Sequence, residues 1–89
     1  MAAQEPQVRF EMSIAEGDVV GVYSNFLGVW HTAHEFTLDF CQSLPGDETA
    51  MDVVARVKVA PTMVGRILEA LSENLAVYEN RFGSVPHVG

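Results

Sequence analysis

The chain has a single cysteine, Cys41, and therefore cannot close an internal disulfide bond. This cysteine usage fits a reducing compartment, and we expect the protein to be cytoplasmic. No apolar run approaches the roughly 20 residues that a membrane-spanning helix needs. The polar first residues, which include Pro6, lack the basic and apolar regions of a secretory signal. We therefore expect no contact with a membrane.

Basic residues are also scarce, because five lysines and arginines stand against twelve acidic residues, for a net charge of −7. Proteins that bind nucleic acid usually present a basic stripe, since phosphate contacts supply much of their affinity. Here only Arg56 and Lys58 lie close together in the sequence. The composition therefore argues against nucleic acid, and equally against an anionic membrane surface, as a partner.

The length of 89 residues is enough for one domain. We expect a flexible leader over residues 1–7, a single domain over residues 8–83 and a flexible tail over residues 84–89. A domain this short buries only about 60% of the surface that its unfolded chain exposes, so its core is thin. Because 48% of the residues are apolar, this thin core favours burial of apolar surface against a partner.

Four segments have the residue pattern of β-strands. Residues 8–14 alternate most regularly, with Val8, Phe10, Met12 and Ile14 on one face. Residues 19–30 are apolar on both faces, and Gly21 and Gly28 are candidates for β-bulges there. Residues 35–41 and 53–59 alternate again, the last with an interruption at Val54. The predicted connections are a turn at residues 16–18, a hairpin link at residues 31–34 and a turn at residues 45–48.

A helix is predicted from Pro61, because proline is well tolerated in the first helical turn. Apolar residues then recur at steps of three and four, and Gly83 and Arg81 fit a helix C-terminus. The predicted fold is α+β: a four-stranded antiparallel meander followed by one long C-terminal amphipathic helix packed on one face. The apolar stripe of the helix comprises Val64, Ile67 or Leu68, Leu71, Leu75, Tyr78 and Phe82.

Several short motifs resemble a small prokaryotic family of domains of unknown function, DUF3467. They are Tyr23-Ser24-Asn25, Val29, the run from Glu35 to Phe40, Arg56-Val57, Ala60-Pro61, Leu71, Glu73-Asn74-Leu75, Tyr78-Glu79 and Phe82-Gly83. The resemblance covers roughly residues 10–83 and implies a short, stand-alone cytoplasmic protein. It implies no reaction. Strands followed by a long helix are also similar in topology to the SecB-type export chaperones, which is an analogy of fold alone.

Residues with potential chemistry have a plainer explanation at each position. His31 and His34 do not have the spacing or helical setting of a zinc-protease motif, and no cysteine lies near them in sequence. Cys41 has no neighbouring base or cation to activate it. Asp39 is better explained as a cross-strand partner of Arg9, Arg56 or Lys58. We therefore expect no catalytic, metal-binding or cofactor-binding residues, and no enzyme.

The second predicted strand carries more large apolar side chains than a sheet with one covered face can bury. One explanation is a bulge that turns all of them into a single core. The other is that some of them form an interface with a partner. The leading hypothesis is a non-enzymatic, homo-oligomeric adaptor or scaffold domain, and the alternative is a SecB-like protein that binds peptides or client proteins. The predicted interface residues are Tyr23, Phe26, Leu27, Val29 and Trp30.

Overall fold

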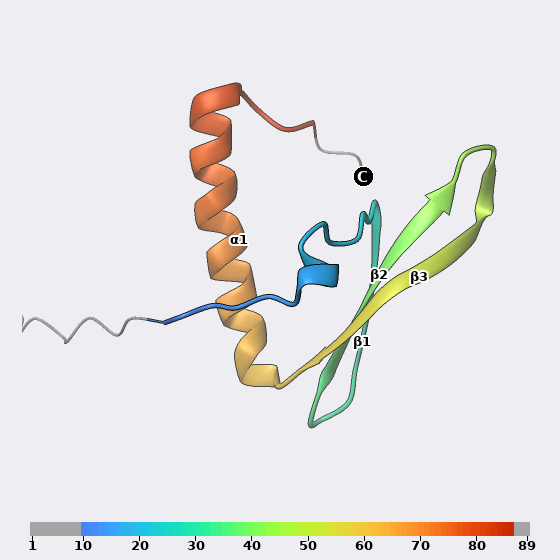
Figure 1. Ribbon diagram of the computed structural model, residues 1–89, viewed down its shortest axis with the longest axis horizontal. Coiled ribbons are helices and arrows are strands. Elements are labelled where there is room, and N and C mark those ends of the chain that lie inside the picture. The colour runs from blue at the N-terminus through green and yellow to red at the C-terminus, as the bar shows by residue number, and fades with distance from the viewer. Residues whose placement is uncertain (1–9, 87–89) are drawn as a thin grey trace, which may run out of the picture.

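The computed structural model describes residues 10–86, in which a three-stranded sheet is followed by a long helix. A short 3₁₀ helix, η1 (Glu16–Asp18), precedes the three strands β1 (Phe26–His31), β2 (Phe36–Leu44) and β3 (Asp47–Val59). The helix α1 (Pro61–Phe82) completes the fold (Figure 1). The predicted α+β class, antiparallel sheet and C-terminal helix are confirmed, but the sheet has three strands and not four.

The three strands form an antiparallel meander in the order β1-β2-β3. The β1–β2 link is closed by Thr32, whose backbone N–H donates to the carbonyl of Glu35 over 2.9 Å. The β2–β3 connection turns at Pro45 and Gly46, where Gly46 has a φ of 85° that glycine adopts without strain. Both hairpin connections were predicted at these positions, because turn residues act locally.

The strand predicted over residues 8–14 is wrong for the part that the structure describes. Residues 10–14 belong to no strand, and the side chains of Phe10, Met12 and Ile14 are between 65% and 94% exposed. An alternating pattern predicts an apolar face, but it does not provide a neighbouring strand. A strand needs such a neighbour to satisfy its backbone N–H and C=O groups. Val8 and Arg9 lie outside the described residues, as do the leader over residues 1–7 and residues 87–89 of the tail.

The second predicted strand is shorter than expected, because it begins at Phe26 and not at Val19. Gly21 has a φ of 76° and its N–H donates to the carbonyl of Asp18 over 3.0 Å, so the chain turns there. The strands β2 and β3 are longer than the predicted segments 35–41 and 53–59, reaching Leu44 and starting at Asp47. Cross-strand pairing extends them through residues that have little strand preference of their own.

The bulges lie in the β2–β3 pair and not at Gly21 or Gly28, which corrects the prediction. The β1–β2 register runs without interruption from Phe26 opposite Cys41 to His31 opposite Phe36. Between β2 and β3 the register shifts after Phe40 and again after Ser43. The first shift leaves Val54 without a partner of its own, which explains why the alternation is broken at this residue.

The helix α1 begins and ends where the sequence predicts. Pro61 is its first residue, and Gly83 follows its last residue with a φ of 95°. The N–H of Gly83 donates to the carbonyl of Glu79 over 2.9 Å. Arg81 lies in the last turn, where its charge is favourable toward the helix dipole. No helix among residues 10–86 is both long and apolar enough to cross a bilayer.

The helix and the sheet meet at the Ala60 link and diverge toward the far end of α1 (Figure 1). Two apolar cavities of about 600 and 320 Å³ separate the N-terminal half of α1 from the sheet. No residue of α1 is buried, and among the residues whose exposure the structure describes only Cys41 and Asp39 are buried. Since protein interiors are normally close-packed, a single chain leaves the space between helix and sheet incompletely filled.

Candidate protein interface

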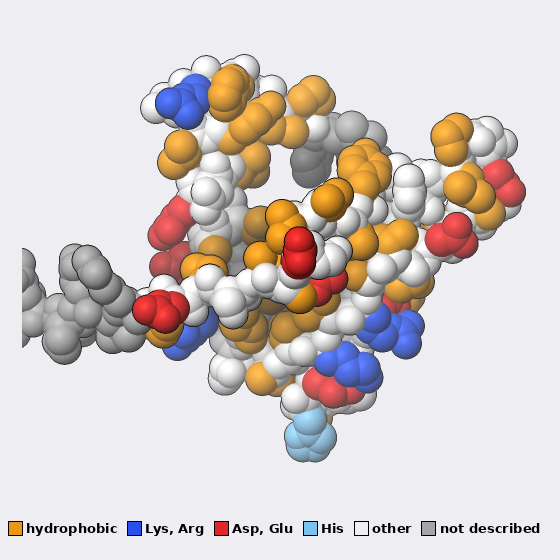
Figure 2. Space-filling view, in the orientation of Figure 1, with side chains coloured by type: hydrophobic (Ala, Val, Ile, Leu, Met, Phe, Trp, Pro, Cys, Tyr) orange, Lys and Arg blue, Asp and Glu red, His pale blue; other side chains and the backbone are white. Residues whose placement is uncertain are grey.

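The five predicted interface residues are all substantially exposed, with between 46% and 69% of each side chain open to solvent. The other explanation, in which a bulge turns all five side chains into a single core, does not hold for this chain. Figure 2 shows that hydrophobic side chains spread over α1 and over the sheet on this face of the molecule. That these residues form an interface remains a prediction. Their exposure leaves them accessible to a partner.

The structure does not bring these five residues together on one face. Leu27 and Val29 face α1 and line the smaller cavity, whereas Phe26 and Trp30 occupy the alternate positions of β1. Successive side chains of a strand point to opposite faces, so an uninterrupted β1 divides the group. Tyr23 precedes the strand. The predicted cluster is therefore two patches, one on each side of the sheet.

Sequence reasoning missed the larger of these surfaces, which is shared between the sheet and α1. Its strand residues come from all three strands, and its helix residues come from the N-terminal half of α1, where Met63 and Ala70 join the stripe residues. The stripe was visible in the sequence, but the sheet was expected to cover it. The two cavities are lined on the sheet side by Leu27, Val29, Phe36, Leu38, Phe40, Val57 and Val59.

The opposite face of the sheet is organised around Asp39. Arg56 donates from Nε to Oδ1 over 2.7 Å and from Nη2 to Oδ2 over 2.9 Å, and Trp30 donates from Nε1 to Oδ2 over 2.8 Å. The Arg56 guanidinium, and next the Trp30 indole, hold the pKa of the Asp39 carboxyl below its ordinary value. Asp39 is only 2% exposed. The expected cross-strand pair is confirmed with Arg56 as its partner.

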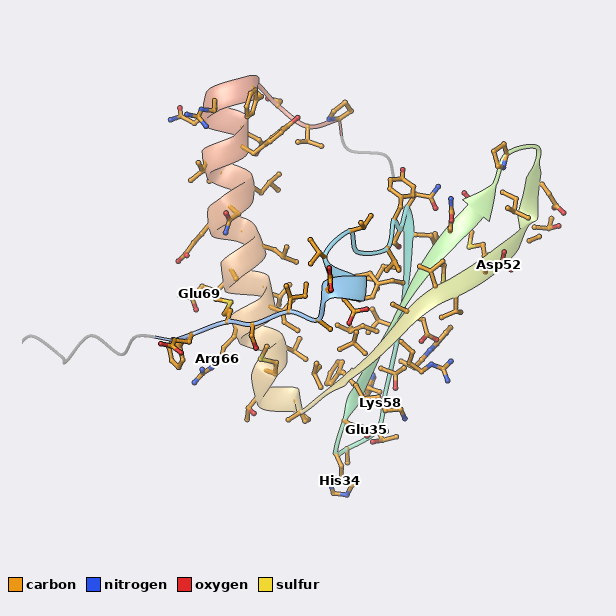
Figure 3. The ribbon with its side chains drawn as sticks, in the orientation of Figure 1. His34, Glu35, Asp52, Lys58, Arg66 and Glu69 are labelled. Atoms are coloured by element: carbon orange, nitrogen blue, oxygen red, sulfur yellow. The ribbon has the colours of Figure 1, made fainter. Side chains whose placement is uncertain are left out.

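Apart from His34, the other candidate chemical groups are held in structural contacts. Glu35 accepts a hydrogen bond from Lys58 Nζ over 3.0 Å, and His34 projects from the hairpin link away from them (Figure 3). The ring of His31 stacks on Phe36 at 5.2 Å between centroids. Cys41 donates from Sγ to the carbonyl of Asp39 over 3.4 Å. Among the side chains that the structure describes, no three metal-ligating groups lie close enough to hold an ion.

The Ser24-Asn25 pair ties the start of β1 to the end of β2. Ser24 Oγ donates to the carbonyl of Cys41 over 2.8 Å. Asn25 Oδ1 accepts the N–H of Ser43 over 2.9 Å, and its Nδ2 donates to Ser43 Oγ over 3.1 Å. These bonds give the Ser-Asn motif a structural role in fixing the hairpin.

Ser24-Asn25, Asp39 and Arg56, which belong to the motifs that suggested a family resemblance, thus hold the strands together. The family model described as protein of unknown function (DUF3467) matches residues 1–86. The chain belongs to the DUF3467 family. No curated protein and no solved structure matches this chain. For this DUF3467 protein, the family description names no activity, so function has to be argued from the surfaces described above.

Proposed function

We propose that this DUF3467 protein is a non-enzymatic, homo-oligomeric adaptor or scaffold domain that acts through protein–protein contacts. The observation that supports it most strongly is the apolar surface that one chain leaves open between α1 and the sheet. Interfaces of obligate homo-oligomers resemble a protein core divided in two. The single cysteine further supports a cytoplasmic setting, as proposed from the sequence.

The total exposed area supports the same proposal. The chain exposes 8508 Å², whereas a folded monomer of 9.7 kDa exposes about 5,100 Å². Even full exposure of residues 1–9 and 87–89 would account for only about 1,900 Å² of the difference. About 1,500 Å² per chain remains, spread over the exposed residues before β1 as well as over α1 and the sheet. This area is of the size that one subunit contributes to an interface of the obligate class.

The open cavities also support a second candidate, a protein that binds peptides or clients in the manner of the SecB-type chaperones. In that case the space between α1 and the sheet stays accessible and receives an apolar segment of another protein. Its lining is almost entirely apolar, with Arg66 the one charged residue around the larger cavity. Apolar grooves with a charged rim suit amphipathic segments of partner proteins.

Light scattering and hydrophobic-dye fluorescence on the same native sample distinguish the two candidates. A scaffold whose surface is sealed by a second copy has the mass of an oligomer and enhances the dye weakly. A client-binding protein enhances the dye strongly, and addition of an apolar peptide reverses that enhancement. A monomer of 9.7 kDa that leaves the dye unchanged would contradict both proposals.

A further inference from the structure

The stripe on α1 follows the heptad spacing of helices that pair with other helices. Its steps from Val64 onward are four, three, four, three and four residues. This places apolar residues at every a and d position, the arrangement that fits one helix against another. We infer that the C-terminal half of α1 pairs antiparallel with the same half of α1 in a second copy. The pairing surface, here called the α1 seam, comprises Leu71, Leu75, Tyr78 and Phe82.

The α1 seam lacks a cover within its own chain over most of its length. Leu71 is the last stripe residue that lines either of the two cavities beside the sheet. Leu75, Tyr78 and Phe82 are between 48% and 68% exposed. Figure 2 shows an opening between this end of α1 and the rest of the chain. The rings of Tyr78 and Phe82 contact each other, with centroids 5.0 Å apart, and present one continuous aromatic surface.

A second copy is the occupant that this pattern fits, and the inference rests on the proposed homo-oligomerisation. A heptad seam is self-complementary, because the a residues of one helix pack between the d residues of another. Each copy also has surplus surface of the size that a stable dimer buries. Three turns of helix bury only part of that surplus, so each helix end also approaches the partly uncovered sheet face of the other copy.

The attachment of the sheet favours an antiparallel pair. Only Ala60 separates β3 from α1, so each sheet is joined at the N-terminal end of its helix and lies beside the N-terminal half. A parallel pair would crowd two sheets at one end, whereas an antiparallel pair separates them and opposes the helix dipoles favourably. Because the N-terminal half of the stripe borders its own sheet, the two-fold axis falls in the C-terminal half. This places Leu75 opposite Tyr78 of the second copy, and Leu71 opposite Phe82.

The flanking polar residues are compatible with this register. The same two-fold axis brings Asn74 opposite Arg81 of the second copy, and Ser72 opposite Glu79. Neither pair combines like charges, which would oppose association. Glu69 and Glu73 fall at the outer b and f positions of the heptad. Two of the three acidic residues of α1 therefore lie away from the seam, and the third, Glu79, flanks it.

The first test introduces one charge on the seam and the same charge beside it. Leu75→Glu places a carboxylate inside the proposed contact and preserves helix propensity, whereas Ala76→Glu places it on the outer side. We expect Leu75→Glu to weaken self-association at least about 30-fold and Ala76→Glu to leave the mass unchanged. Light scattering gives the mass, and circular dichroism monitors the helix.

The outcomes separate the seam from the proposed function. A dimeric Leu75→Glu variant would overturn the seam and leave homo-oligomerisation intact. A wild-type protein that is monomeric at high concentration would overturn both. Dissociation of both variants to the same extent would also contradict the seam, because it would indicate a general effect of charge.

A distance measurement tests the antiparallel register without disrupting the contact. Spin labels are attached at Glu69→Cys or Ala76→Cys in a Cys41→Ala background. The two sites lie one heptad from each other on the outer side of the helix. An antiparallel pair separates the two labels by about 23 Å along the axis at position 69 and about 2 Å at position 76. Equal distances at the two sites would show a parallel pair, and no intermolecular distance at either would overturn the helix contact.

Discussion

The indole of Trp30 reaches across to the neighbouring strand and donates a 2.8 Å hydrogen bond from Nε1 to Oδ2 of Asp39. The residue directly opposite Asp39 is not Trp30 but Gly28. A Cβ atom at Gly28 would lie 3.4 Å from Cζ2 of the indole and 4.0 Å from Cβ of Asp39. The missing side chain of Gly28 therefore leaves the space in which the indole covers the buried carboxylate.

Enlarging Gly28 should displace the indole. We expect Gly28→Val to break the Trp30–Asp39 hydrogen bond, because its branched methyl groups need the space that the ring occupies. Gly28→Ala is the control, since a single methyl group makes ordinary contact there. Trp30 is the only tryptophan, so its fluorescence reports the change directly. The valine variant should emit at longer wavelength than the alanine variant, and identical spectra would show that Gly28 does not position the ring.

Asp39 should make stability depend on pH in the acid range. Its pKa is lower in the folded chain than in the unfolded chain, where it is about 3.9. The ionised carboxylate therefore stabilises the fold above that pH, and the contribution is lost as the pH falls through the folded pKa. The urea midpoints of wild type and Asp39→Asn should differ at neutral pH and converge below about pH 4. Asp52→Asn serves as the charge-matched control, and a pH-independent difference for Asp39→Asn would contradict the ion pair.

Two glycines, Gly65 within α1 and Gly83 directly after it, should respond oppositely to alanine. Gly83 has φ 95° and ψ 173°, a conformation that is essentially restricted to glycine, so Gly83→Ala should destabilise by about 1–3 kcal/mol. Gly65 lies within the helix with open space around its Cβ position, so Gly65→Ala should stabilise by about 0.5–1 kcal/mol. Urea unfolding of both variants at one protein concentration measures the difference. Stabilisation by Gly83→Ala would show that the α1 terminus is wrongly placed, and destabilisation by Gly65→Ala would contradict the open space around Gly65.

Removal of the Asn25 side chain should loosen the start of β1. Asn25→Ala removes the acceptor of the exposed Ser43 N–H and should destabilise by about 0.5–1.5 kcal/mol. Ser43→Ala removes only the bond from Asn25 Nδ2 to the hydroxyl and should cost less. Urea unfolding gives the free energies, and amide hydrogen exchange at Ser43 localises the effect. Equal losses in the two variants would contradict the bond to the Ser43 backbone.

Features that depend on neighbouring residues could be predicted from the sequence. Pro61 and Gly83 act within one turn of the helix, so the bounds of α1 were predicted closely. The turns at the two hairpins were likewise local. Asp39 could be assigned to a cross-strand pair, although the sequence did not distinguish between Arg56 and other partners.

Features that depend on distant partners could not be predicted in the same way. Phe10, Met12 and Ile14 alternate as a strand does, but the described sheet provides no neighbour for them. The division of Phe26 and Trp30 from Leu27 and Val29 follows from the β1–β2 register, which sequence reasoning replaced with bulges. The opening beside α1 could not be foreseen either, since the stripe alone does not say how much of it the sheet covers.

The most direct test of the proposed association is the dependence of thermal stability on protein concentration. If a second copy covers the apolar surface of α1 and the sheet, folding and association are linked, and the unfolding midpoint should rise across an approximately hundred-fold increase in concentration. The Leu75→Glu variant should lose this dependence together with stability. A wild-type midpoint that is high and identical at every concentration would contradict the account, because it would show that one chain folds stably with that surface open.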